Sequence, residues 1–355
     1  MADLPVDELD NKTPLQVSDH PNMDWIAKNS LCGISRNVPV GMDPESSVAN
    51  LSILGYDPLK YYTGRAPLEA GALGIKLSPE DLVFRCNLVT VENEILVDYS
   101  AGHISDEEAR SLIVSLNAHL GIKGEIEFYS GVGYRNLLVL HGEQFSDDVR
   151  CFPPHDFQGN RISDLMVKPL SKEAVFTANL LIDLILKSKK ILENHPVNLR
   201  RIKLGKKPAN MIWVWGCGRR PNLPSFTSLF GIKGAVITAV SLIKGIGFYA
   251  GLKVIEVPGA TGYYDTNYEG KADYALKGLE EGYDLVYIHV EAPDEASHEG
   301  NVEMKIKSIE DLDKRLIGRI LDKIHSISED FILLCLLYTS PSPRDLSTSR
   351  MPSSA

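Results

Sequence analysis

Two side chains that suit a metal ion lie four residues apart near the C-terminal end of the sequence. Asp294 and His298 stand in APDEASHEGN, residues 292–301, directly after the apolar run DLVYIHV. Such a run predicts a buried strand, and α/β sheets collect functional groups just past the C-terminal ends of their strands. A carboxylate and an imidazole at this spacing can reach one ion from consecutive helical turns and suit Mn, Zn or Mg-like ions. A helix-start aspartate and a surface histidine would explain the same pair without a metal.

A second segment offers a nucleophile. PESSVANLSILGYDP, residues 44–58, places Ser46 and Ser47 where a helix is expected to begin. A hydroxyl at that point lies near unpaired backbone N–H groups, which stabilise phosphate charge, so either serine could accept a phosphoryl group. The alternative is that the two serines only cap the helix.

The elements that would position these groups follow an alternating pattern. Short β-rich runs such as DLVFRCNLVTV, MIWVWG and KGAVITAV alternate with longer helical patterns such as SDEEARSLIVSLNAHLG. This alternation predicts α/β layers with several buried strands. Ser105, followed three residues later by Glu108, predicts a capped helix start. We predict a core sheet built from residues 1–80 and 230–334, with residues 81–229 inserted as a smaller α/β domain.

Composition excludes several classes of partner. The formal net charge is −10, and Lys and Arg are scattered along the chain, which argues against nucleic acid or an anionic membrane as the main partner. The five cysteines are widely spaced without a CxxC pair, so neither a disulfide framework nor a zinc finger is indicated. The sequence shows no signal peptide and no stretch of membrane-span length. We therefore expect a cytoplasmic protein.

The last residues differ in character from the rest. From Tyr338 the chain is rich in Ser, Pro and Arg and almost without apolar residues, which is typical of a disordered tail. A sequencing adapter derived from a transposon would, in one reading frame, encode Cys335 to Asp345, and a matching adapter segment would encode Ser349 to Ala355. We therefore expect residues 335–355 to be adapter read-through and the natural sequence to end near Leu334.

Collinear motifs along residues 1–334 resemble the archaeal-type, cofactor-independent phosphoglycerate mutases of the alkaline-phosphatase superfamily. The segments that carry the resemblance are MADLPVDELDNKTPL, PNMDWIA, SSVANLSILGYDP, YYTGRAPLEA, FRCNLVT, DYSAGHIS, PPHDFQGN, GIKGAVITAVSLIKGIG, VPGATGYYDTNYEGKADYAL and HVEAPDEASHEGN. The resemblance implies a phosphatase-like core sheet with an inserted lid, two divalent metal ions (Mn or Mg, with Zn or Co as alternatives), and no need for 2,3-bisphosphoglycerate. The implied partner is a small phosphorylated substrate.

The resemblance also implies roles for single residues. Ser46 matches the family's nucleophilic serine, which would form a phosphoserine while 3-phosphoglycerate and 2-phosphoglycerate interconvert. Glu45 and Ser47 stand where the family has glycine and aspartate, which leaves Ser47 open as the acceptor. Asp294 and His298 match the pair that holds one ion, and Ser46 faces the other ion.

The family's remaining metal ligands have no counterpart in this sequence. They are an aspartate before the Met-Ala-Asp segment and an Asp-His pair followed by a histidine beyond FILL. Their absence predicts a chain cut at both ends, poorly soluble and inactive as it stands. A homoserine kinase-like phosphotransferase of the same superfamily is the alternative activity. A noncatalytic metal- or phosphate-binding fragment is the alternative from another class.

Further basic groups are placed where they could bind the substrate. Arginine and lysine side chains next to glycine-rich turns could clamp a carboxylate or a phosphate, and histidines could transfer protons or contact the substrate. A surface position or a structural hydrogen bond is the alternative for each. The candidates are Arg65, His103, His155, Arg219, Arg220 and Lys233.

Overall fold

The computed structural model describes residues 4–324 and 330–336 and divides the chain into two compact units. Unit 1 combines residues 1–62 with the chain from Leu223 onward, and unit 2 comprises residues 63–222. Unit 2 is therefore one continuous segment inserted into unit 1. Of the segment expected to be adapter-derived, 335–355, residues 337–355 lie outside the described residues.

Unit 2 is built on a five-stranded antiparallel sheet. The strands follow the order β2-β1-β4-β3, and β7 pairs with the other edge of the long strand β1. Its strands are β1 (Leu82–Glu92), β2 (Ile95–Asp98), β3 (Ile126–Val132), β4 (Arg135–Leu140) and β7 (Met211–Arg219), with a separate pair β5 (Val149–Arg150) and β6 (Lys168–Pro169). Its helices are α5 (Arg65–Ala72), α6 (Asp106–Leu120), η2 (Ile162–Leu165), α7 (Val175–Leu192) and α8 (Pro196–Lys203).

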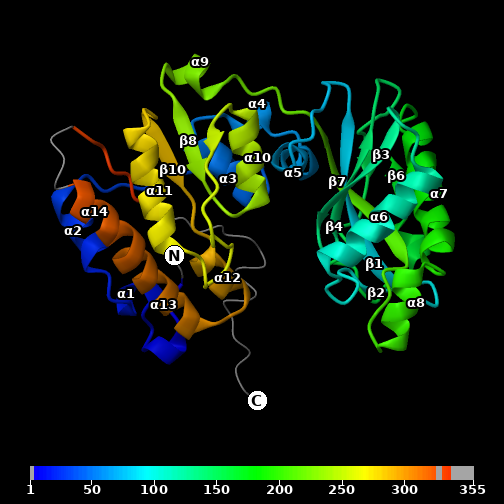
Figure 1. Ribbon diagram of the computed structural model, residues 1–355, viewed down its shortest axis with the longest axis horizontal. Coiled ribbons are helices and arrows are strands. Elements are labelled where there is room, and N and C mark those ends of the chain that lie inside the picture. Colours follow the sequence, from blue (N-terminus) through cyan, green and yellow to red (C-terminus); the bar gives the residue numbers. More distant parts are fainter. Residues whose placement is uncertain (1–3, 325–329, 337–355) are drawn as a thin grey trace. The chain divides into compact units, whose positions relative to one another are not determined.

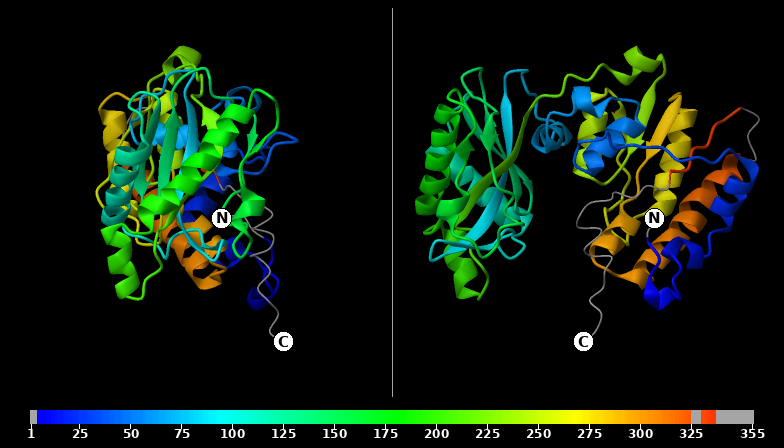
Figure 2. Two further views of the ribbon diagram at one scale, coloured as in Figure 1. Left: turned by 90° about the vertical axis from the view of Figure 1, so that its right-hand side faces the viewer. Right: turned by 180° about the vertical axis from the view of Figure 1, so that it is seen from behind.

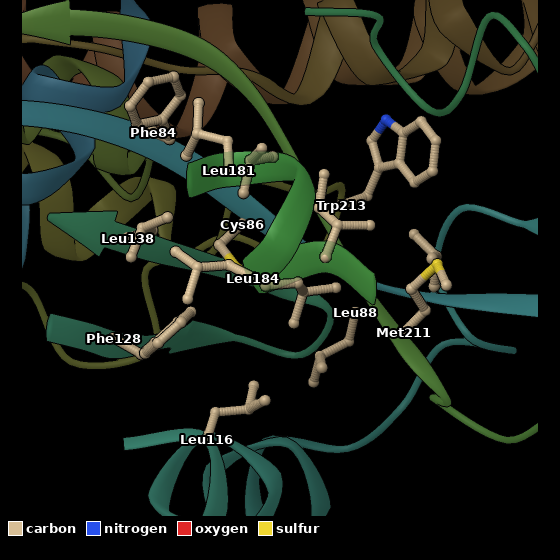
Figure 3. Close-up of a cluster of buried hydrophobic side chains, with 14 of the residues drawn as sticks. Phe84, Cys86, Leu88, Leu116, Phe128, Leu138, Leu181, Leu184, Met211 and Trp213 are labelled. Carbon is tan, nitrogen blue, oxygen red and sulfur yellow. The ribbon is translucent and has the colours of Figure 1, made fainter. Parts of the chain in front are cut away.

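The main core of unit 2 lies between this sheet and helices α6 and α7 (Figure 1). Figure 3 shows Phe84, Cys86 and Leu88 of β1 in one cluster with side chains from both helices. The predicted start of α6 is confirmed, because the Ser105 side chain accepts a hydrogen bond from the backbone N–H of Glu108. The alternation of apolar residues along β1 thus decides which sheet face the two helices cover.

The opposite face of the sheet is covered at one end by α5. Ala66 and Ala70 of this helix form a second apolar cluster with Val83 of β1 and with Leu137 and Val139 of β4. This packing assigns α5 to unit 2. The inserted unit therefore begins at residue 63 and ends at 222, whereas the sequence predicted 81 and 229, because a helix ahead of the first strand gives no local sign of which sheet it covers.

Unit 1 contains a parallel sheet in the order β10-β8-β9. Its strands are β8 (Gly234–Ile237), β9 (Lys253–Val254) and β10 (Leu285–Ile288). Its first helices are η1 (Asp7–Leu9), α1 (Pro14–Val17), α2 (Pro21–Asn29), α3 (Ser46–Ile53) and α4 (Pro58–Tyr61). The later ones are α9 (Phe226–Phe230), α10 (Ser241–Tyr249), α11 (Tyr268–Glu280), α12 (Ala292–His298), α13 (Val302–Asp311), the π-helical turn η3 (Leu312–Ile317) and α14 (Gly318–Ile324).

Helices from the two ends of the chain pack together in unit 1. The early helix α2 lies beside the late segment from α13 to α14, as Figure 1 and the right-hand view of Figure 2 show in blue and orange. The carboxylate of Asp313 accepts hydrogen bonds from the backbone N–H groups of Asn22 (3.2 Å) and Met23 (2.7 Å). Since the N-cap His20 makes no side-chain cap, Asp313 supplies the acceptor that the start of α2 needs.

The chain between residues 4 and 324, together with 330–336, contains no helix both long and apolar enough to cross a membrane.

Candidate active site

Ser46 is the first residue of α3, as the sequence predicted for a phosphoryl acceptor. The N-cap residue is Glu45, and no side chain caps this helix, so neither serine plays the capping role that was the alternative. The first-turn N–H groups of a helix have no intrahelical partner and favour negative charge. Ser46 therefore stands at a point of α3 where a phosphate would be stabilised.

The two serines of this segment occupy different environments. Ser47 is fully buried, and its hydroxyl donates to Glu45 Oε2 at 3.0 Å; the Tyr62 hydroxyl donates to the same oxygen at 2.7 Å. Ser46 is only half-buried and lines a cavity. A ligand in that cavity can reach Ser46, whereas Ser47 is occupied by the Glu45 carboxylate.

The cavity lies within unit 1 and has a volume of about 580 Å³. One part of its wall is polar and combines α3 with the residues that follow β10. The polar residues include Ser46, Asn50, His289, Glu291 and Asp294. The rest is mostly apolar and includes Leu316 of η3 and the segment from Ile332 to Leu336. The structure thus brings Ser46 and Asp294, two residues 248 positions apart, to one cavity.

Asp294 and His298 lie on α12, which follows the C-terminal end of β10. The Asp294 Oδ2 atom lies 3.2 Å from His298 Nε2, as the four-residue spacing predicts. Burial raises the pKa of Asp294, but the hydrogen bond and charge of His298 outweigh it, and the net pKa is lowered. Tyr263 and Tyr264 donate hydrogen bonds to Glu299 at 2.7 and 2.5 Å and so hold the end of this helix.

Two groups at the same strand end, the buried Lys271 and the partly buried His289, were not predicted. The Lys271 side chain on α11 is almost fully buried, and its Nζ donates to the His289 carbonyl at 3.0 Å. Burial lowers the pKa of Lys271 to about 8, against the opposing charge of Glu291. Burial and the Lys271 charge lower the pKa of His289 to about 4. His289 directly follows an apolar strand, and this position is the sequence feature that could have identified it. Lys271 has no such feature, because its sequence context is that of an ordinary helix residue.

Lys233, a predicted substrate-binding residue, lies at the other end of the sheet. It precedes β8, and its backbone N–H donates to Asp284, which in turn precedes β10. Because β8 and β10 are parallel, the amino ends of the two strands lie together at one end of the sheet. Their carboxyl ends lie together at the opposite end. The structure therefore does not bring Lys233 to Ser46 or Asp294.

The other predicted substrate-binding residues belong to unit 2. Arg65 opens α5 and is partly exposed, and its Nε lies 3.3 Å from Glu69 Oε1. His155 lies edge-on to the Trp215 ring with 5.0 Å between ring centroids, and exposed His103 lies against Tyr134 at 6.3 Å. A network of aromatic contacts thus supports both histidines.

Arg219 and Arg220 are neighbours with different surroundings. The Arg219 guanidinium donates to the backbone oxygens of Glu80 and Phe145, both at 2.5 Å, and so ties two loops of unit 2 together. Arg220 is exposed. A structural role thus accounts for Arg219, whereas Arg220 stays open to a ligand.

The donor set of α12 fits a divalent cation in type. Asp294 and His298 offer one carboxylate and one imidazole, and Ser46 adds a hydroxyl at the same cavity. Over the described ranges, no three His, Cys, Asp or Glu side chains gather closely enough to hold a metal ion. The pair can therefore provide part of a coordination shell.

Comparison with known proteins gives one consistent family. Residues 27–198 match the family model described as 2,3-bisphosphoglycerate-independent phosphoglycerate mutase. A relative of that name from Methanosarcina barkeri is 51% identical over 348 residues, covering 98% of this chain and 85% of the relative. A second, from Methanothermobacter thermautotrophicus, is 50% identical over 98% of this chain and 83% of its own length. This coverage extends past Leu334, and the assignment of residues 335–355 to an adapter stays a prediction.

Solved structures agree with the sequence comparison. A cofactor-independent phosphoglycerate mutase from Thermoplasma acidophilum matches with a TM-score of 0.63 and 31% identity, covering 92% of this chain and 82% of its own. A Pyrococcus horikoshii protein matches with a TM-score of 0.74 and 32% identity, covering 91% and 76%. The predicted mixed α/β fold is thereby confirmed.

Proposed function

Because the chain belongs to the family of 2,3-bisphosphoglycerate-independent phosphoglycerate mutases, we propose that Ser46 carries the phosphoryl group while 3-phosphoglycerate and 2-phosphoglycerate interconvert. The observation that carries the proposal is the contrast between the two serines. Ser46 opens α3 and lines the cavity that Asp294 also lines, whereas Ser47 is buried against Glu45. The activity is that of an isomerase, as in the relatives of the same name.

The proposed reaction is a double phosphoryl transfer. The Ser46 oxygen bonds to the substrate phosphorus, the bond from phosphorus to the glycerate 3-oxygen breaks, and the serine proton ends on that oxygen. After the glycerate reorients, its 2-oxygen attacks the phosphoserine, and the Ser46 oxygen takes a proton back. The start of α3 favours the negative charge of the transferred group, and the Lys271 ammonium adds positive charge at the same strand end.

We propose that Asp294 and His298 hold one of two divalent ions, Mn or Mg with Zn or Co as alternatives. Bound there, such an ion would lower the pKa of the Ser46 hydroxyl and neutralise phosphate charge. Two side chains and the Ser46 hydroxyl do not complete a coordination shell, and the described residues place no third His, Cys, Asp or Glu beside the pair. We therefore propose that this 355-residue chain alone turns over little substrate.

Unit 2 is proposed to act as the lid that the sequence predicted. A closed lid excludes water, which would otherwise hydrolyse the phosphoserine and turn the mutase into a phosphatase. Arg65, His103, His155 and Arg220 are its candidate contacts with the substrate. Arg219 is the least suited of the predicted residues, because two backbone oxygens already occupy its guanidinium.

The test uses a chimaera that joins residues 1–334 to the parts of the Methanosarcina barkeri relative that precede and follow its stretch aligned with residues 1–334. With Mn²⁺ and 3-phosphoglycerate, we expect ³¹P NMR to show 2-phosphoglycerate and mass spectrometry to find phosphate on Ser46. Ser46→Ala should abolish both signals, while the matched Ser47→Ala variant should keep them. Phosphate on Ser47 alone would refute the assignment. Turnover only with homoserine and a nucleotide would instead establish the kinase-like alternative.

A further inference from the structure

Arg85 is a buried arginine on the face of the unit 2 sheet that α5 covers, and the proposed reaction does not use it. Arg85 of β1 is only 5% exposed. Its Nε lies 3.1 Å from Glu69 Oε2, and its guanidinium carbon lies 4.2 Å from the centroid of the Trp215 ring on β7. Trp215 is fixed in turn, because its indole N–H donates to Asn87 at 3.0 Å. The Arg85 guanidinium is thus held in one plane by a carboxylate and an aromatic ring.

Glu69 serves two arginines at once. One carboxylate oxygen lies against Arg85 Nε and the other lies 3.3 Å from Arg65 Nε. Both contacts use Nε, and the terminal NH₂ groups of the two guanidiniums make no hydrogen bond among the described residues. These NH₂ groups are not among the buried side-chain atoms that lack a partner, so solvent, or a ligand in its place, can reach them. Paired arginine forks fit the oxygens of phosphate and carboxylate groups.

The charge around Arg85 is not balanced. Burial lowers the pKa of Arg85 to about 10; Glu69 opposes this shift, while the charges of Arg65 and Arg135 add to it. The charges of Arg65 and Arg135 therefore both disfavour the charged form of Arg85, and Glu69 is the carboxylate that opposes them. This excess of positive charge destabilises the cluster by itself and would be relieved by an anion.

We propose that Arg85, together with Arg65, forms an oxyanion-binding site of unit 2, with Glu69 and Trp215 as the positioning residues. The site takes a phosphate or carboxylate group of a small ligand. The identity of that ligand as a phosphoglycerate, which carries both groups, rests on the proposed mutase function. The anion site itself does not, because it is defined by the two guanidinium groups.

The test is calorimetric titration of the full chain with inorganic phosphate and, separately, with D-glycerate. The variants are Arg85→Lys, which keeps the charge but loses the planar fork, and Arg65→Ala at a partly exposed position. Arg110→Lys, an exposed arginine on α6, is the matched control. Ser46→Ala separates this site from the cavity of unit 1.

We expect Arg85→Lys and Arg65→Ala each to raise the Kd of at least one anion about tenfold or more, as for a lost charge-assisted hydrogen bond. The Tm of both should stay within about 2 °C of the unaltered chain, and Arg110→Lys and Ser46→Ala should bind as the unaltered chain does. The anion whose affinity falls identifies the group that is recognised. Absence of saturable binding of either anion would overturn the proposal. So would unchanged affinity in Arg65→Ala, which decides the question if Arg85→Lys does not fold. Loss of mutase turnover in the chimaera with anion binding retained would count against the proposed function alone.

Discussion

The ammonium group of Lys271 lies 3.0 Å from the carbonyl oxygen of His289, at the strand end that carries the cavity residues. A lysine that is 1% exposed is costly to bury, and the contact is to a neutral carbonyl. A buried ammonium at a cavity edge is a candidate functional group, because its charge costs stability.

The first prediction is that Lys271→Met, measured in the chimaera, lowers kcat about tenfold or more while the free energy of unfolding changes by less than about 1 kcal/mol. The physical reason is that Met fills the same space without a buried charge. Steady-state kinetics and urea denaturation check the two halves separately. A variant that is much less stable but retains kcat would show that Lys271 has a structural role and no role in the reaction.

The second prediction concerns Asp294 and His298. In the chimaera, Asp294→Asn and His298→Ala should each weaken Mn²⁺ binding and lower kcat by about 100-fold or more, as when metal ligands and charge-stabilising groups are lost. Both side chains are partly exposed, so the fold should survive. The exposed Glu303→Gln on α13 serves as control for a charge change. Full activity in either variant would mean that the pair is a helix start and a surface histidine.

The third prediction is a pH dependence of stability in unit 2. Partial burial raises the pKa of Asp98, but hydrogen bonds from Lys207 (2.7 Å) and Ser100 outweigh it and lower the pKa to about 2. In the unfolded chain an aspartate titrates near 3.9. Because the folded pKa is the lower one, the stabilisation is fully present above about pH 5 and is lost as the pH falls toward 2.

Urea denaturation of the protein and its Asp98→Asn variant between pH 6 and pH 2 checks this dependence. The difference between their unfolding midpoints should shrink steadily below pH 5. A constant difference across that range would show that the loss in Asp98→Asn is independent of the charge.

The fourth prediction uses the close approach of two backbones beside Arg65. A Cβ added at Gly218 would lie 2.0 Å from the Thr63 backbone oxygen. Gly218 has no positive φ, so Gly218→Ala adds a steric clash without adding backbone strain. We expect a loss of about 1–3 kcal/mol in the free energy of unfolding, together with weaker anion binding at Arg65. Gly262→Ala, where an added Cβ meets nothing within 4 Å, is the control. Equal stability of the two variants would contradict the observed packing.

Local sequence motifs predicted where helices and strands begin and end, but they did not predict which side chains these elements bury. The strand end before Asp294 and the helix start at Ser46 follow from an apolar run and from the residue types that begin helices, which are local properties. Burial is not local: Lys271 and Arg85 have the same side chains as any surface residue, and only the packing of α11 and α5 removes them from water. The place of Lys233 was hidden from the sequence for the same reason, since a glycine-rich turn beside a strand does not reveal which end of the sheet it occupies.

The contact between Asp313 and Met23 has a consequence for the order in which the nascent chain folds. These residues are 290 positions apart, whereas unit 2 is one continuous segment. At a synthesis rate of about 5–20 residues per second, α2 waits roughly 15–60 s on the ribosome for the carboxylate that completes its first turn. Unit 2 can fold during that interval with contacts it already contains. Met23, the buried residue of α2, stays in water until the last helices of unit 1 emerge.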